Sequence, residues 1–327
     1  MGSFYRSIIV ISWVILFIHT NSNAQNHHLI FNQLSEEDGL LEAQEYFLSF
    51  DSDNLTWIGT DHGLMSYDGV NLERVEHLDS ISDILARSKI TSKCFEDHTN
   101  DLWFSNNNAL CHFNRSTNEI QGFTHSDSSS NYKLVDLNKD GEVFLTFEIN
   151  KRRALYSYNI GNGTFDKITN LQGSKCHLIF NNQAQLEQVI ETSLPRQPGL
   201  IWQNVLTGKS KHVKFLEKTD GSKRTFSSRV SGVKSDSKGN LWVGLYNGIG
   251  LYIPGEDDGT VAFERFSLID EDIGWVKDIE ILDEEHLLIA CDVGLVLFDL
   301  NKKSFTYKFD NHKDNPFSLQ LLSLIHI

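Results

Sequence analysis

The side chains best suited to hold a polar ligand fall in short loops that follow aromatic or apolar segments. They are acids, amides, arginines, a histidine and a tyrosine, namely Asp61, His62, Asn106, Asn107, Asn108, Arg152, Arg153, Tyr246, Asn247 and Asp292. Amides and acids can hydrogen-bond adjacent sugar hydroxyls, and an aromatic ring offers a face on which a sugar can stack. This set therefore predicts binding of an oligosaccharide or another small polar molecule. The alternative, that these are ordinary hydrophilic loop residues, stays open.

No residues in the sequence have the spacing of a catalytic or metal site. A glycosidase needs two facing carboxylates, and 44 acidic residues supply too many pairs for one to be diagnostic. Asp236 and Gly239 lie too far apart for the Asp-box of sialidases. Adjacent histidines such as His27-His28 are more often solvated than metal-bound. We expect no catalytic residue, no metal and no cofactor. The basic cluster at 151–153 is expected on a solvated loop, with contact to an anionic ligand as the alternative.

An internal repeat must position these loops. The segment Asp51-Ser-Asp-Asn-Leu-Thr-Trp57 recurs at 97–103 and 236–242, and in weaker form at 138–144. Each aromatic residue is followed at fixed steps by a small residue and then an aromatic one, as in Trp57, Gly63, Tyr67, and Leu288 begins a degenerate copy of the same steps. A further eroded copy is expected within 177–215, where Gly199-Leu-Ile-Trp202 stands for its second half.

Each unit is expected to form four short strands, which in the first copy span 46–50, 56–59, 64–67 and 71–75. An aspartate can accept bonds from turn amides, while Asn or Gly tolerates positive φ at the tip of the turn. The tryptophan on the second strand is expected to fill the gap between neighbouring sheets. Four-stranded units repeated about every 40 to 50 residues predict an all-β fold, a β-propeller with about six units plus the start of a seventh. A β-sandwich is the alternative, and no helical periodicity of useful length competes.

Composition narrows the function classes. The net charge of −15 disfavours binding of nucleic acid, because an acidic chain repels phosphate backbones. The four cysteines are too few and too scattered for a disulfide scaffold, and no Cys/His cluster supports zinc. We expect each cysteine to be a small buried hydrophobe.

The N-terminus is expected to be a signal peptide covering residues 1–24. Arg6 is followed by an apolar stretch from Ile8 to Ile18, which is about half of the ~20 residues that span a bilayer. Small residues at 22–24 offer a cleavage point before Gln25. Residues 25–327 would then form the propeller outside the cytoplasm; a retained membrane anchor is the less favoured alternative.

The motifs resemble the two-component regulator propeller family. The lead-in Phe31-Asn-Gln-Leu-Ser-Glu-Glu-Asp-Gly-Leu40 precedes Leu55-Thr-Trp-Ile-Gly-Thr-Asp-His-Gly-Leu-Met-Ser-Tyr-Asp-Gly69, and the match continues at 238–244 and 283–299. The family pattern is D-x-x-G-x-L-W-x-G-T-x-x-G-L-x-x-Y-D. Such propellers form the periplasmic sensor region of hybrid histidine kinases, which pass a signal through a phosphorelay.

The resemblance implies a non-catalytic periplasmic sensor of oligosaccharides or other polysaccharide breakdown products. Its expected partners are that ligand, the downstream kinase region of the same membrane-anchored protein, and a second copy forming a homodimer. An extracytoplasmic propeller enzyme such as a lyase or glycosidase is the alternative. The chain is expected to be a fragment cut in mid-blade, since Asp314-Asn-Pro-Phe-Ser-Leu319 resembles the lead-in to a seventh unit and no second half follows.

Overall fold

The computed structural model describes most of the repeat region. The described residues are 34, 36–41, 47–75, 80–127, 131–173, 175–181, 183–192, 200–213, 216–219, 222–225, 230, 232–253, 262–266 and 273–310. The expected signal peptide, the His27-His28 pair and the segment 314–327 lie outside these residues.

The strands form six sheets, which are the blades of a six-bladed β-propeller. Blades 1 to 3 consist of β1 (Phe47–Phe50), β2 (Thr56–Thr60), β3 (Gly63–Tyr67), β4 (Leu72–Arg74); β5 (Phe95–Glu96), β6 (Leu102–Ser105), β7 (Leu110–Asn114), β8 (Glu119–Phe123); and β9 (Lys133–Leu137), β10 (Val143–Ile149), β11 (Arg152–Asn159), β12 (Thr164–Asn170). Blades 4 to 6 consist of β13 (Cys176–Phe180), β14 (Leu186–Thr192), β15 (Leu200–Asn204), β16 (Ser210–Val213); β19 (Val233–Ser235), β20 (Leu241–Leu245), β21 (Gly248–Tyr252), β22 (Ala262–Phe266); and β23 (Val276–Ile281), β24 (His286–Cys291), β25 (Gly294–Asp299), β26 (Ser304–Asp310). The all-β propeller expected from the repeat is confirmed.

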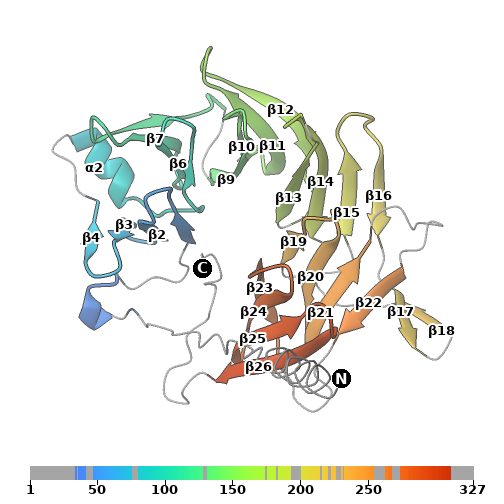
Figure 1. Cartoon of the computed structure of the whole chain (residues 1–327). Coiled ribbons are helices and arrows are strands. Elements are labelled where there is room, and N and C mark those ends of the chain that lie inside the picture. The colour runs from blue at the N-terminus through green and yellow to red at the C-terminus, as the bar shows by residue number, and fades with distance from the viewer. Residues whose placement is uncertain are drawn as a thin grey trace, which may run out of the picture. The chain divides into compact units, whose positions relative to one another are not determined.

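Within each blade the four strands pair antiparallel in chain order. In Figure 1 the blades follow one another around a centre, and β9, β13, β19 and β23, the first strands of their blades, lie nearest to it. Because consecutive strands run in opposite directions, the turns after the first and third strands share one face, which we call the turn face. The loops after the second strands share the other face with the segments joining consecutive blades, and we call it the connection face.

The repeated turn between the first and second strands forms as expected. In blade 1, Asp51 Oδ1 accepts bonds from the backbone N–H groups of Asp53 and Leu55 at 3.0 and 2.9 Å. Asp97, Asn138, Asn181 and Asp236 hold the corresponding turns of blades 2 to 5 in the same way. The tip residue has positive φ in all five, and these residues are Asn54, Asn100, Gly141, Ala184 and Gly239.

The repeated tryptophans are buried between blades. Trp57, Trp103 and Trp242 are 5, 2 and 4% exposed. A separate apolar cluster lies between each successive pair of blades, so that Trp57 packs against blade 2 and Trp242 against blade 6. The indole N–H of each ring also donates to its own turn aspartate, at 2.9, 2.9 and 3.4 Å respectively. One carboxylate oxygen therefore holds the turn while the other holds the ring.

Blade 4 is the eroded copy. Its third strand begins at Leu200, directly after Gly199, the residue at which the second half of this copy was expected to begin. Trp202 lies on that strand. A register shift between Ile179 and Phe180 of β13 pairs Gln188 of β14 with Ile179, as the aromatic residue pairs in blades 1, 2, 3 and 5. The degenerate sixth copy keeps the expected register, because Leu288 pairs with Glu280 as Trp57 pairs with Ser49.

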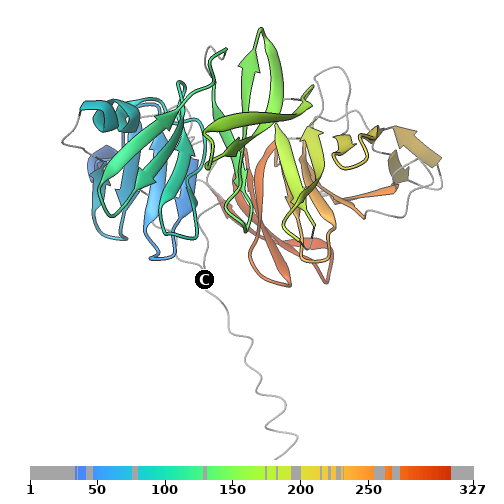
Figure 2. The ribbon, with the colours of Figure 1, turned by 90° about the horizontal axis from the view of Figure 1, so that it is seen from above.

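Three elements depart from the regular repeat. The 3-10 helix η1 (Glu36–Asp38) precedes the first blade in the chain. The helix α2 (Ser80–Arg87) lies in the connection between blades 1 and 2 and contacts β3 and β8, and Figure 2 shows it beside these blades. A hairpin of β17 (Leu216–Thr219) and β18 (Ser222–Thr225) extends the sheet of blade 5, with β17 parallel to β22. None of these was expected from the sequence.

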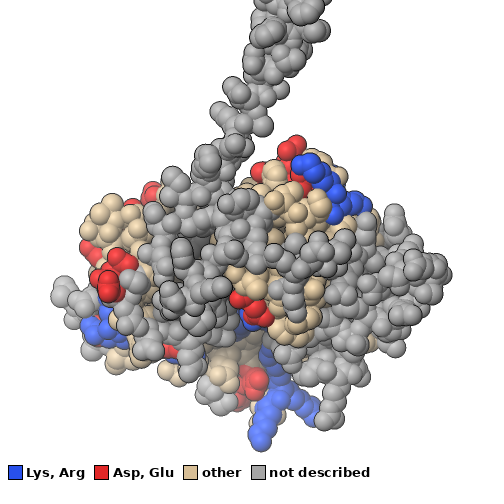
Figure 3. Space-filling model, turned by 90° about the horizontal axis from the view of Figure 1, so that it is seen from below, with Lys and Arg blue, Asp and Glu red and all other residues tan. Residues whose placement is uncertain are grey.

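The cysteines are free thiols. Cys94, Cys111 and Cys291 are buried as expected, whereas Cys176 is partly exposed. Burial raises the pKa of Cys94 and of Cys176 to about 12 and raises that of Cys111 as well. On the face seen in Figure 3, acidic and basic side chains are interspersed.

Candidate functional site

The candidate ligand-binding residues all lie on or beside the connection face, in loops that hold the segment leading to the next blade. Thr60 O accepts a bond from Ile90 N, Leu171 N donates to Arg153 O, and Asp292 N donates to Trp275 O. These bonds confirm that the second-to-third-strand loops share a face with the blade connections. Several of the candidate side chains take part in the same junctions.

At the junction of blades 1 and 2, Asp61 forms an ion pair with Lys89 at 2.6 Å. The neighbouring His62 is exposed, and its carbonyl accepts a bond from Arg74 Nη2. Asp61 therefore fixes a connection, and His62 is the more accessible of the two.

The three candidate asparagines of blade 2 differ in their surroundings. Asn106 is fully buried; its Oδ1 accepts bonds from Asn108 N and Ala109 N, and its Nδ2 donates to Leu85 O. Asn107 contacts the connections through its main chain, and Asn108 is exposed. Asn106 thus shapes the loop, while Asn108 faces solvent.

The two arginines of the basic cluster in blade 3 have different surroundings. Arg152 is exposed, as expected for a solvated loop. Arg153 is half-buried and donates from Nη2 to the carbonyl of Gly173. The same segment is held by Glu191, a fully buried acid whose Oε2 accepts the N–H bonds of Gln172 and Gly173 at 2.6 Å each. Glu191 was not expected from the sequence, because nothing in the repeat marks its position.

The junction of blades 5 and 6 brings three candidates together with two residues that the sequence did not single out. Tyr246 is 42% exposed, and its ring lies 5.3 Å from that of Trp275 at an interplanar angle of 71°. Asn247 Oδ1 accepts a bond from Ile273 N at 3.0 Å. Asp292 Oδ2 accepts a bond from Trp275 N at 2.7 Å, and its Oδ1 pairs with Lys277 at 2.7 Å. We call these five residues the Tyr246–Trp275 site.

The first strands carry a second group of polar side chains near the centre of the propeller. Lys234 on β19 pairs with Glu280 on β23 at 2.7 Å. Burial raises the pKa of Asp136 on β9 to about 6, and burial, with Lys234 nearby, lowers the pKa of His177 on β13 to about 4. His177 Nε2 is enclosed and has no hydrogen-bond partner among the described residues. None of these four residues was expected from the sequence.

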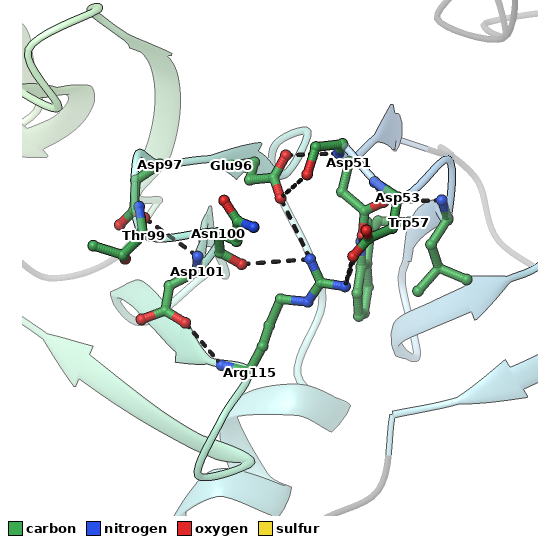
Figure 4. A network of polar contacts seen from close by, with 11 residues as sticks. Asp51, Asp53, Trp57, Glu96, Asp97, Thr99, Asn100, Asp101 and Arg115 are labelled. Carbon is green, nitrogen blue, oxygen red and sulfur yellow. Dashed lines mark hydrogen bonds and ion pairs between the residues drawn. The ribbon is translucent and has the colours of Figure 1, made fainter.

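On the turn face, one arginine joins blades 1 and 2, as Figure 4 shows. Arg115 Nη2 lies 3.3 Å from Asp51 Oδ2 and 3.1 Å from Asp53 Oδ2, and Nη1 lies 3.4 Å from Glu96 Oε1. Glu96 in turn accepts bonds from the N–H and the hydroxyl of Ser52 at 2.7 and 2.9 Å. Because Asp51 is completely buried and also holds the indole of Trp57, this arginine compensates a buried negative charge.

Within the described residues, no group of three or more His, Cys, Asp or Glu side chains is arranged to hold a metal ion. Over the same residues, no helix is both long and apolar enough to cross a membrane.

Comparison with solved structures identifies the fold. The extracellular domains of two proteins from B. thetaiotaomicron, both assigned as hybrid two-component systems, align with TM-scores of 0.59 and 0.60 and identities of 17 and 18%. The alignments cover 85 and 88% of this chain. The chain has the same β-propeller fold as these two extracellular domains. It spans 35 and 37% of the length of those two extracellular domains.

An enzyme shares the propeller architecture. Virginiamycin B lyase from Staphylococcus aureus aligns with a TM-score of 0.56 and 11% identity, over 82% of this chain and 85% of the lyase. No family model matches this chain, and no curated protein matches it either.

Proposed function

We propose that this chain is the ligand-sensing propeller of a hybrid two-component sensor protein and that it binds an oligosaccharide without chemical turnover. The observation that carries the proposal is the likeness of its fold to two extracellular domains of such systems. The lead-in at 31–40 and the motif that recurs at 51–57, 97–103 and 236–242 support the same assignment. The kinase region, which would receive the signal, belongs to sequence beyond this propeller.

The Tyr246–Trp275 site is the proposed place of ligand contact. A partly exposed aromatic pair offers a face for a sugar ring, and the Asp292 carboxylate and the Lys277 ammonium stand beside it to accept and donate hydrogen bonds. Loops from several blades reach the same connection face, so His62, Asn108 and Arg152 are placed to extend the contact to a longer chain.

Export to the periplasm is part of the proposal, and it rests on the apolar segment 8–18 and on the extracellular location of the two similar domains. N-terminal sequencing of the protein recovered from the periplasm is expected to begin near Gln25. Recovery of exported protein that still begins at Met1 would overturn this part.

A lyase or glycosidase is the second candidate function, because the virginiamycin B lyase propeller aligns over most of its own length. The two candidates differ in turnover. A sensor binds the ligand and returns it unchanged, whereas a lyase or hydrolase produces shortened oligosaccharides.

The experiment measures binding and turnover on the same sample. Defined oligosaccharide pools are titrated by calorimetry, and each mixture is then analysed by mass spectrometry. We expect saturable binding with no new products, and at least tenfold weaker binding in Tyr246→Ala and Trp275→Ala. Leu206→Ala, an exposed residue near the end of β15 on the turn face, is the matched control. Turnover of any pool, or equal binding by all three variants, would overturn the proposal.

A further inference from the structure

A pocket opens on the turn face between blades 3 and 4. Its volume is about 250 Å³, which is below the usual 300–1,000 Å³ of a small-molecule site and suits a side-chain-sized group. An apolar floor is formed by Phe144, Ile168, Leu186 and Val205. The rim is polar and consists of Asn138, Asp140, Glu142, Ser157 and Gln185.

The pocket occupies the place that corresponds to the Arg115 network between blades 1 and 2. Asn138 holds the first turn of blade 3 as Asp51 holds that of blade 1, and Asp140 follows it as Asp53 follows Asp51. Both junctions therefore present one carboxylate from the same turn position of the preceding blade.

The group that fills this place in blade 2 is missing from blade 4. Arg115 follows Asn114, whose Oδ1 accepts a bond from Thr117 N, and Val205 follows Asn204, whose Oδ1 accepts the same bond from Thr207 N. Val205 thus holds the turn position of Arg115. Its short apolar side chain lines the pocket and leaves unfilled the space that a guanidinium takes between blades 1 and 2.

Asp140 and Glu142 carry the negative charge of the pocket and are both exposed, whereas Asn138, at the position of Asp51, is neutral. Within the described part of the chain, neither Asp140 nor Glu142 forms an ion pair with a lysine or arginine. Asn138 Nδ2 donates to Glu142 Oε2 at 3.2 Å and to Ala184 O at 2.9 Å, which fixes the amide at the junction. A planar cation with several N–H donors and a short apolar stem would match both the acidic rim and the apolar floor.

We propose that the pocket between blades 3 and 4 binds a guanidinium group supplied from outside the chain, in the place where Arg115 supplies one between blades 1 and 2. The guanidinium comes either from a free small molecule or from an arginine side chain of a peptide. This site lies on the turn face, opposite the Tyr246–Trp275 site, and does not depend on the proposed oligosaccharide sensing.

The test uses the full chain, with agmatine as the free guanidinium and the peptide Gly-Arg-Gly as the side-chain source. Binding is measured by calorimetry and by thermal shift, with sodium chloride at matched ionic strength and tetramethylammonium, which lacks N–H donors, as controls. The tighter of the two probes assigns the source. Stabilisation that sodium chloride or tetramethylammonium reproduces in full would overturn the proposal.

Two sets of variants locate the site. Asp140→Asn combined with Glu142→Gln is expected to weaken binding at least tenfold, whereas the matched exposed pair Glu119→Gln and Asp127→Asn on blade 2 should leave it unchanged. Val205→Arg is expected to fill the pocket, abolish binding and raise the melting temperature. Unchanged binding in the Asp140/Glu142 variant would refute the site even if Val205→Arg failed to fold.

The blade 1–2 junction provides the reciprocal test. Arg115→Ala should melt at a lower temperature than the parent, and millimolar agmatine should restore more of that loss than tetramethylammonium does. If agmatine stabilises Arg115→Ala no more than it stabilises the parent, the correspondence between the two junctions fails and the proposal fails with it.

Discussion

Replacing Trp103 tests whether the repeated ring holds two blades together. The side chain is 2% exposed, and its ring lies 5.8 Å from Phe123 of blade 2 and 6.1 Å from Tyr158 of blade 3. Trp103→Ala removes these contacts and leaves a cavity between two sheets, which cannot easily close. We expect a loss of about 3–5 kcal/mol in the free energy of unfolding.

Trp103→Phe separates the packing of the ring from its hydrogen bond. The smaller ring keeps much of the apolar contact but leaves Asp97 Oδ2 without the indole donor, which lies at 2.9 Å. Loss of a bond to a charged acceptor costs about 1.5–3 kcal/mol. Burial by itself would raise the pKa of Asp97, but bonds from Thr99, Trp103 and Asp101 outweigh it and lower that pKa. In Trp103→Phe the pKa of Asp97 should therefore rise.

The assay is urea unfolding followed by far-ultraviolet circular dichroism, because removing a tryptophan changes the fluorescence signal. The slope with urea is compared between variants to confirm that the same surface unfolds. Ile160→Ala, 57% exposed in a turn of blade 3, is the control and should shift stability by less than about 0.5 kcal/mol. If Trp103→Ala unfolds with the parent but loses oligosaccharide binding, the ring lines a ligand site and the assigned register is wrong.

Three further predictions concern the buried acid, the strand-start glycine and the thiols. Burial raises the pKa of Asp136 from 3.8 to about 6, so its contribution to stability is present below pH 3.8 and is lost as the pH rises through 6. Asp136→Asn should therefore gain stability over the parent between pH 4 and 7, by up to about 3 kcal/mol, in denaturation curves measured across that range; a constant difference would refute the assigned burial. Gly63→Ala should destabilise far more than Gly69→Ala, because both have positive φ but only at Gly63 would the new Cβ clash with a backbone oxygen, that of Ala86; equal melting temperatures would contradict this. Cys94 and Cys111 should resist a thiol reagent at pH 8 until urea unfolds the chain, because burial raises both pKa values; rapid labelling of either residue in the native protein would show that its strand opens.

The parts of the fold that were predictable depend on residues close together in the sequence. The turn aspartate, the tip residue and the tryptophan of one blade lie within seven positions, as at Asp51, Asn54 and Trp57, and their bonds close inside that segment. A repeated local pattern then predicts a repeated local structure, whatever lies around it. The strand bounds, the turn geometry and the buried rings followed from this pattern.

The missed elements depend on contacts between distant residues. The buried side of α2 carries Ser82 and Ala86, whereas its isoleucines Ile81 and Ile84 are 68 and 64% exposed. The apolar residues of this short segment have helical spacing but do not predict which side is buried, because Ser82 docks the helix by bonding to the main chain of Ile120. Trp275 and Glu191 likewise gain their surroundings from loops of other strands or blades, which no spacing in the sequence displays. For the candidate ligand residues, the sequence predicted the face that they share. It did not predict which of their side chains bond to the segments that connect the blades.

In each regular blade the tryptophan packs against the next blade, and this arrangement affects how a propeller can gain blades by gene duplication. A blade built on the Asp51–Trp57 pattern carries one half of the junction before it and one half of the junction after it, so a duplicated gene segment would match its neighbours at both ends wherever it was inserted. A junction between blades that lack the Asp51–Trp57 pattern would not accept an inserted copy in this way. Between blades 3 and 4, Asn138 stands in place of the turn aspartate and donates to the carbonyl of Ala184, a bond that the aspartate of the regular pattern could not donate. Divergence at this junction thus fixes the order of the blades, and further duplications are expected to be tolerated on the side of blades 1 and 2.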